Sequence, residues 1–377
     1  MPSHTQILNL GINEMKSASS MEHEQKQAFP QIVYFGLSRG VSGEEHPQPI
    51  VLLQFWYLTM PIRAAAKAKN RKVRIALLCC GEFTGKLLKD NGDYLAFHTR
   101  WLRKSLPKNS KVKPKVDAYK VYTEDHPLPT DEEIDDYDAI LVSGSPSDAW
   151  ADEPAWIPRL VDFIRKVGTN YPEVRIFAIC FGHQIVNRAL GGTVDGSREK
   201  PWEIGPTQVN TTYMGKILYG KEKLELQQFH QDHVPLESLT EFLITGDIYL
   251  VASSADYPNH GIVQFYPLDP NADPNAEFNL HERIHILTSQ GHPEYTQKIV
   301  TEMARQREEK HTIPQKTVDD YFGPNGRNAE EKPMVLSGTG RRWARDYDGV
   351  IVIGHAFWKM FGVKYPDEEE EEDEDQE

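Results

Sequence analysis

A cysteine at position 180 stands where the sequence changes from a strand-like to a helix-like pattern. Residues 178–184 read AICFGHQ; the apolar run 174–180 predicts a buried strand and residues 182–190 predict a helix. A sharp strand-to-helix turn presents a nucleophile at the carboxyl edge of a sheet, and the helix N-terminus favours a thiolate. A cysteine in such a run is also often a small core hydrophobe, but the Gly-His-Gln that follows favours Cys180 as a nucleophile.

A histidine and a glutamate two positions apart follow another apolar run. Residues 288–295 read TSQGHPEY, at the end of a predicted strand. Residues i and i+2 of an extended chain point the same way, so Glu294 can orient the imidazole of His292 as the base that a thiolate needs. Alone, His-Pro-Glu is more typical of a surface turn. Together with the cysteine turn, it predicts a Cys180–His292–Glu294 active site.

Acyl transfer at such a site also needs N–H donors for the oxyanion that forms on the substrate. The backbone N–H of Phe181, directly after the nucleophile, is one natural donor. A second is expected from the turn SGSP at residues 143–146, whose glycine permits the backbone to aim an N–H inward. An ordinary Gly-Pro turn explains this segment equally well when it is taken alone.

The elements that must position these groups form a regular alternation between residues 72 and 310. Strand-like apolar runs occupy residues 73–80, 115–122, 137–143, 174–180 and 284–290. Apolar residues recur at helical spacing over residues 156–167, 182–190 and 295–308. Such alternation predicts an α/β fold with a doubly wound, mostly parallel sheet and helices on both faces. All the proposed chemical groups then follow strands at one sheet edge.

Charge and cysteine content narrow the class of protein. Much of the formal net charge of -14 comes from residues 366–377, an acidic run that we expect to be a disordered, solubilising tail rather than a docking motif. Nucleic-acid binding is not indicated, because no excess of Lys and Arg exists. The three cysteines include two neighbours, Cys79 and Cys80, which suits the cytoplasm or nucleus. No Cys/His cluster has zinc-ligand spacing, so we expect neither metal nor cofactor.

Taken together, these segments resemble the class I glutamine amidotransferase family over about residues 72–310, especially its free-standing members and the γ-glutamyl peptidases. The resemblance implies a flavodoxin-like fold, with Cys180 as nucleophile, His292 as base and Glu294 as its partner. The residues that it places around these three are expected to donate oxyanion N–H groups (Ser145, Phe181) and to contact the substrate (Gly144, Gln184, His230, Asp232). The sequence departs from the family pattern at Ala178 and at Ser145, where the family has glycine. The second departure leaves open whether the oxyanion hole forms without a substrate or partner.

We divide the chain into four parts. Residues 1–70 are expected to be a poorly structured extension, with Met60 as a candidate translation start, and residues 71–311 the amidotransferase-like domain. Residues 312–365 are expected to be a linker and a C-terminal helix that docks on the core, and residues 366–377 the acidic tail. The apolar segment 50–60 is too short to span a bilayer, so no membrane attachment is expected.

The resemblance implies an amidohydrolase that cleaves the γ-glutamyl C–N bond through a cysteine thioester. We favour a stand-alone glutamine amidotransferase-like enzyme, with a γ-glutamyl peptidase acting on glutathione-type conjugates as the alternative. The residues after 310 are too few for an ATP-dependent synthase, so ammonia either reaches a separate synthase or is released. A non-catalytic binding or scaffold protein is a second alternative, which the complete set of Cys, His and Glu disfavours.

Overall fold

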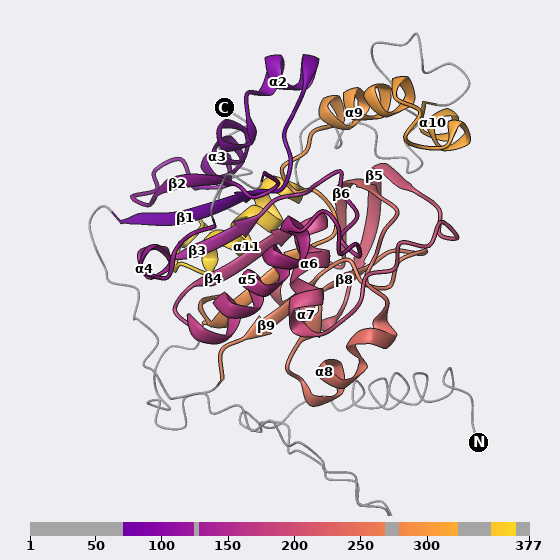
Figure 1. Cartoon of the computed structure of the whole chain (residues 1–377). Helices are drawn as coiled ribbons and strands as arrows, with labels where there is room; N and C mark the ends of the chain where they lie inside the picture. Colours follow the sequence, from indigo (N-terminus) through magenta and orange to yellow (C-terminus); the bar gives the residue numbers. More distant parts are fainter. Residues whose placement is uncertain (1–70, 124–127, 268–278, 323–347, 367–377) are drawn as a thin grey trace, which may run out of the picture. The chain divides into compact units, whose positions relative to one another are not determined.

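A computed structural model describes residues 71–123, 128–267, 279–322 and 348–366. The expectations for residues 1–70 and for the acidic run after Pro366 lie outside the described residues. The larger sheet has seven strands in the order β2 (Lys113–Lys120), β1 (Lys72–Cys79), β3 (Ala139–Val142), β4 (Arg175–Ile179), β10 (Ile284–Ser289), β9 (Ile262–Phe265) and β7 (Tyr249–Leu250) (Figure 1).

The five strands from β2 to β10 are parallel to one another. At one edge of the sheet, β9 is antiparallel to β10 and β7 is antiparallel to β9. Parallel strands are buried on both faces, and all four residues of β3 are buried accordingly. The prediction of an α/β, doubly wound, mostly parallel sheet is therefore confirmed. The antiparallel edge arises because the chain between β4 and β10 builds a second, smaller sheet before it returns.

Side chains that alternate along each strand enter two hydrophobic layers. In β1, Ile75 and Leu77 pack with α3 (Tyr94–Lys104) and α11 (Gly354–Lys359) on one face. Ala76 and Leu78 pack on the other face with α5 (Trp156–Asn170) and α6 (Phe181–Leu190). Figure 1 shows the helices α5 and α6 together on one side of this sheet. The two layers hold the carboxyl edge of the sheet rigid.

The smaller sheet has the order β6 (Lys223–His230), β5 (Glu203–Thr211), β8 (Ala252–Ser253), and its strands are antiparallel. The local sequence pattern does not predict these strands, because β5 is largely polar along its exposed positions; the helix α7 (Tyr213–Tyr219) separates β5 from β6. The remaining α-helices of the described residues are α2 (Gly85–Asn91), α4 (Asp131–Ile134), α8 (Thr240–Thr245), α9 (Gln297–Glu309) and α10 (Gln315–Phe322). None of the helices in the described ranges has the length and apolarity that a bilayer span needs.

Residues 348–363 pack into the same core as α3. A π-helical turn (Gly349–Ile353) continues into α11, where the fully buried Trp358 donates its indole N–H to the carbonyl of Leu102 at 2.9 Å. The expectation of a linker from residue 312 needs correction, because residues 315–322 form α10 and its Val318 is buried in this core. Polar residues on the outer face of α10 hide its helical period in the sequence. The boundary at residue 311 stays a prediction.

Candidate active site

Cys180 lies in the turn between β4 and α6, in the strained backbone that a nucleophile turn requires. Its φ of 52° and ψ of -108° are rare for a non-glycine residue and cost about 1–3 kcal/mol. Its N–H donates to the carbonyl of Ser289 at 2.8 Å, which ties the turn to the end of β10. A Cβ atom at Gly182 would lie only 2.5 Å from the carbonyl oxygen of Val142, so only glycine lets α6 pack this closely on β3.

His292 and Glu294 lie in the loop that follows β10. The imidazole Nδ1 is 2.8 Å from a carboxylate oxygen of Glu294, and both side chains are buried. The backbone N–H of His292 donates to the carbonyl of Gln227 in β6 at 2.8 Å. The ring stacks on Tyr295 with 3.8 Å between ring centroids and an angle of 3° between planes. The carboxylate, the backbone bond and the stacked ring together fix the orientation of the imidazole.

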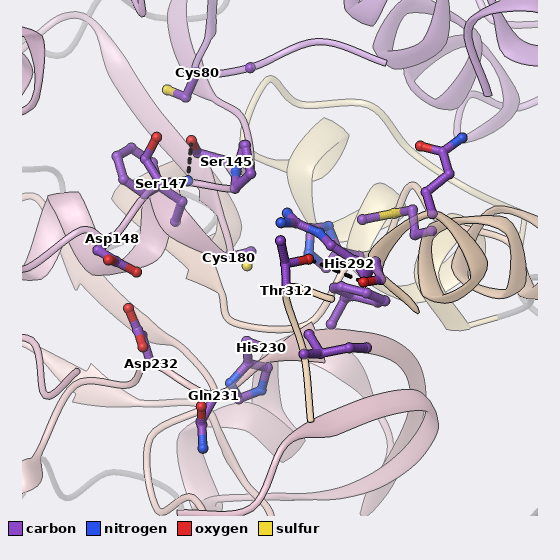
Figure 2. Close-up of a pocket in the computed structure, with 18 of the residues that line it drawn as sticks. Cys80, Ser145, Ser147, Asp148, Cys180, His230, Gln231, Asp232, His292 and Thr312 are labelled. Carbon is purple, nitrogen blue, oxygen red and sulfur yellow. Dashed lines mark hydrogen bonds between the residues drawn. The ribbon is translucent and has the colours of Figure 1, made fainter. Parts of the chain in front are cut away.

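Cys180 and His292 lie next to each other at the sheet edge, where both come within 4 Å of the position that a Cβ atom would take on Gly144 (Figure 2). Burial, the largest single effect, lowers the pKa of His292, but the neighbouring charges of Glu294 and Cys180 outweigh it and raise the pKa to about 10. The imidazole is therefore held in its protonated form beside the sulfur. Gly144 makes this approach possible, because a Cβ atom there would lie 2.8 Å from Cε1 of His292.

A cavity of about 910 Å³ opens above these residues, and Cys180 and His292 line it. Figure 2 shows Asp148 and Asp232 on one side of Cys180 and Thr312 on the other. Thr312 follows α9, whose last turn also contributes to the lining, so the cavity lies between the large sheet and α9. It is much larger than a glutamine side chain needs.

One end of the cavity carries a charged cluster. The guanidinium of Arg198 donates to Asp232 at 2.8 Å and lies 3.4 Å from Asp148. Burial raises the pKa of Asp232 to about 6, although Arg198 acts in the opposite direction. The cluster presents both a cation and carboxylates, which is what an α-amino acid group requires of its binding site.

The structure places the predicted oxyanion donors beside the nucleophile. Ser145 and Phe181 both line the cavity with Cys180. The N–H of Phe181 is at the first position of α6, where a helix has no partner for it, and neither N–H donates to an acceptor among the described residues. Both groups are therefore available to a developing oxyanion, and the assignment of that role stays a prediction.

The predicted substrate contacts divide into two groups. Asp232 and Gln184 line the cavity, although the amide of Gln184 also donates to the carbonyl of Asp232 and to Gln290. Gly144 packs against His292 and is absent from the lining. His230 lines the cavity, but its Nε2 is bound to Glu203 at 3.0 Å and its side chain is almost fully buried. Direct substrate contact therefore has structural support at Asp232 and Gln184 and lacks it at Gly144 and His230.

Several site residues escaped the sequence analysis. Tyr295 directly follows the His-Pro-Glu motif, so its position in the sequence could have indicated an aromatic residue that packs against His292. Arg198 lies in an irregular segment with no motif, and Arg307 and Lys310 lie at the end of a helix predicted only from its apolar period. His98, from α3, lies near enough to Glu294 that the carboxylate opposes the lowering of its pKa by burial. Only the fold brings these residues to the site.

Comparisons with known proteins agree with this geometry. The family model for glutamine amidotransferase class-I matches residues 109–307, more than half of the 377 residues. The chain belongs to the class I glutamine amidotransferase family. The resemblance found in the sequence is thus confirmed, and the matched segment includes Cys180, His292 and Glu294.

Two curated relatives share this part of the chain. A glutamine amidotransferase-like protein of Schizosaccharomyces pombe is 30% identical over 189 residues, which are 50% of this chain and 65% of the relative. Gamma-glutamyl peptidase 4 of Arabidopsis thaliana is 30% identical over 190 residues, which are 49% of this chain and 63% of the relative. The matches thus span less than two thirds of either relative. A solved glutamine amidotransferase of Thermotoga maritima aligns with 78% of this chain and 99% of its own at 16% identity, with a TM-score of 0.45.

Proposed function

We propose that this protein is a cysteine-dependent amidohydrolase that cleaves the C–N bond of a γ-glutamyl amide. The observation that carries the proposal is the position of Cys180 beside His292 at an open cavity, with the imidazole of His292 2.8 Å from the carboxylate of Glu294. A nucleophile, a base and an orienting carboxylate are the three groups that acyl transfer requires. A scaffold protein has no need for a cysteine, a histidine and a carboxylate set together beside an open cavity.

The chemistry proceeds through a thioester. The thiolate of Cys180 attacks the γ-carbonyl carbon, and the oxyanion accepts hydrogen bonds from the N–H groups of Ser145 and Phe181. The imidazolium of His292 gives its proton to the leaving nitrogen as the C–N bond breaks. A water molecule then loses a proton to His292 and attacks the thioester, and the C–S bond breaks to release glutamate and the thiolate.

The leaving amine distinguishes two versions of this activity. Glutamine would release ammonia, and a γ-glutamyl peptide would release an amino acid or peptide. The cavity continues past Cys180 toward α9, where Arg307 and Lys310 line it, and neither forms an ion pair with another described residue. Two unpaired cations on the leaving-group side favour an amine that carries a carboxylate, which supports the peptidase as the second candidate.

Glutamate release from glutamine, glutathione and a γ-glutamyl dipeptide tests the proposal. We expect Cys180→Ala to lower kcat by at least about 10³-fold on every substrate that the wild type cleaves. Cys79→Ala is the matched control, because Cys79 is a buried thiol of the same layer that does not line the cavity and should retain activity. Release that survived the Cys180 substitution would remove the mechanism. A preference for the peptides over glutamine would select the peptidase.

A further inference from the structure

A second group of histidines and a carboxylate lies beside the cavity, apart from the Cys180 site. One oxygen of Glu203, Oε2, is 3.0 Å from Nε2 of His230 and 3.1 Å from Nε2 of His260. All three atoms lie within 4.8 Å of one another. No local pattern indicates this group, because its members are far apart in the chain and match no known spacing of metal ligands.

The small sheet fixes the positions of all three side chains. Glu203 begins β5 and His230 ends β6, and the two residues are directly opposite in the antiparallel ladder. The backbone N–H of His260 donates to the carbonyl of Ala252 in β8 at 2.8 Å. Two of the side chains thus lie on neighbouring strands, which hold geometry better than loops, and His260 lies in the loop before β9, tied to β8 by its backbone hydrogen bond.

The carboxylate of Glu203 is buried with little to neutralise it. One of its oxygens, Oε2, faces the two imidazoles. Its other oxygen accepts a hydrogen bond from Ser254 at 2.7 Å. No Lys or Arg of the described ranges pairs with it. A buried carboxylate costs several kcal/mol unless a positive charge accompanies it.

Hydrogen bonding explains only part of the arrangement. His230 and Glu203 form a hydrogen bond of ordinary length. His260, whose side chain is 0% exposed, makes no hydrogen bond with either ring nitrogen to any described residue, although its Nε2 faces the carboxylate at 3.1 Å. Such a buried group needs a partner that the protein itself does not supply.

We propose that Glu203, His230 and His260 bind a divalent transition-metal ion, with zinc as the ion that fits best. Zinc takes imidazole nitrogen and carboxylate oxygen at about 2.0–2.2 Å, and tetrahedral geometry then separates the ligand atoms by roughly 3.3 Å. The observed separations of 3.0 and 3.1 Å need an adjustment of a few tenths of an ångström. The ion would supply the positive charge and the partner that His260 lacks, and it would reach the site through the cavity that His230 lines.

Zinc content after incubation with Zn²⁺ and desalting tests this site in the full chain. The experiment uses a Cys180→Ala background, because the active-site thiol itself could bind zinc. We expect about one zinc per chain in this background and little in the added variants His260→Gln and Glu203→Gln. His285→Gln is the matched control, since His285 is also buried with an unpartnered ring nitrogen but lies outside the group. It should retain zinc.

The outcomes separate the site from adventitious binding. Zinc that stays bound in His260→Gln, or that is lost from the wild type when only Cys180 is changed, would overturn the proposal, as would no retention in any variant. Should the variants fail to fold, X-ray absorption of the zinc-loaded wild type decides the ligands. We expect nitrogen and oxygen scatterers at about 2.0 Å, and a sulfur scatterer at about 2.3 Å would place the metal at the thiol instead.

Discussion

The protein contains two buried imidazole–carboxylate pairs of nearly the same geometry. His292 is 2.8 Å from Glu294 in the loop after β10, and His230 is 3.0 Å from Glu203 at the end of the small sheet. All four side chains are nearly inaccessible to solvent. Distance and burial therefore do not distinguish the two pairs.

The third group beside each pair makes the difference. The thiol of Cys180 adds to the effect of Glu294, and the pKa of His292 rises to about 10 although burial acts against it. Glu203 is shared with a second imidazole, that of His260, and burial prevails at His230, whose pKa falls. The imidazole of such a pair thus has its pKa raised beside sulfur and lowered where a second imidazole shares the carboxylate.

Among the changes that should distinguish the two pairs, removing the charge of Glu294 is expected to have the largest effect. Glu294→Gln keeps the shape of the side chain but removes the anion that orients and stabilises the imidazolium. We expect kcat to fall by about 10³-fold while the melting temperature changes little. Steady-state kinetics with a γ-glutamyl anilide measure this. Activity within tenfold of the wild type would mean that Glu294 does not support His292.

The pH dependence of kcat tests whether the pKa of His292 is raised, which is the property that distinguishes this pair from the other one. Because the folded protein raises the pKa of His292, the imidazolium that protonates the leaving nitrogen persists until the pH passes about 10. We expect kcat to fall above that pH, by up to about tenfold per pH unit. In Glu294→Gln this alkaline limb should move to lower pH. A wild-type limb near the ordinary histidine pKa would contradict the coupling of His292 to its two neighbours.

A smaller effect is expected from the packing behind the His292 loop. A Cβ atom at Gly349 would lie 2.3 Å from the carbonyl oxygen of Pro293, between the base and its carboxylate. Gly349→Ala should therefore displace the loop, lower kcat by about tenfold and destabilise the fold by about 1–3 kcal/mol. In the control Gly168→Ala, the nearest atom to the new methyl group is 3.8 Å away. Kinetics and denaturant unfolding of both variants make the comparison, and equal results would refute it.

The smallest effect is expected at the other pair. Ser254→Ala removes the 2.7 Å hydrogen bond to Glu203 and should lower the free energy of unfolding by about 1 kcal/mol. We expect kcat to stay within twofold of the wild type, because Ser254 is absent from the lining of the cavity. A marked loss of kcat would show that the two pairs are coupled.

The sequence predicts local features of this protein well. The strand, turn and helix around Cys180 are contiguous, and the two-residue spacing of His292 and Glu294 already encodes their common direction. The central strands were found because parallel strands are apolar throughout. The β5–β6 hairpin and the helix α3 were missed, since β5 is largely polar along its exposed positions. Arg198 and the Glu203 group depend on contacts between distant segments, which no local pattern records.

The burial of Trp358 has a consequence for the synthesis of the chain. Its neighbours in α3 are translated some two hundred and fifty residues earlier, as the separation of 256 between Trp358 and Leu102 shows. Until residues 348–363 leave the ribosome, that face of the sheet lacks part of its cover and Pro293 lacks its neighbour Gly349. Expression fragments that stop where the family match ends, at residue 307, would expose the same apolar surface. A workable fragment must extend past Val363.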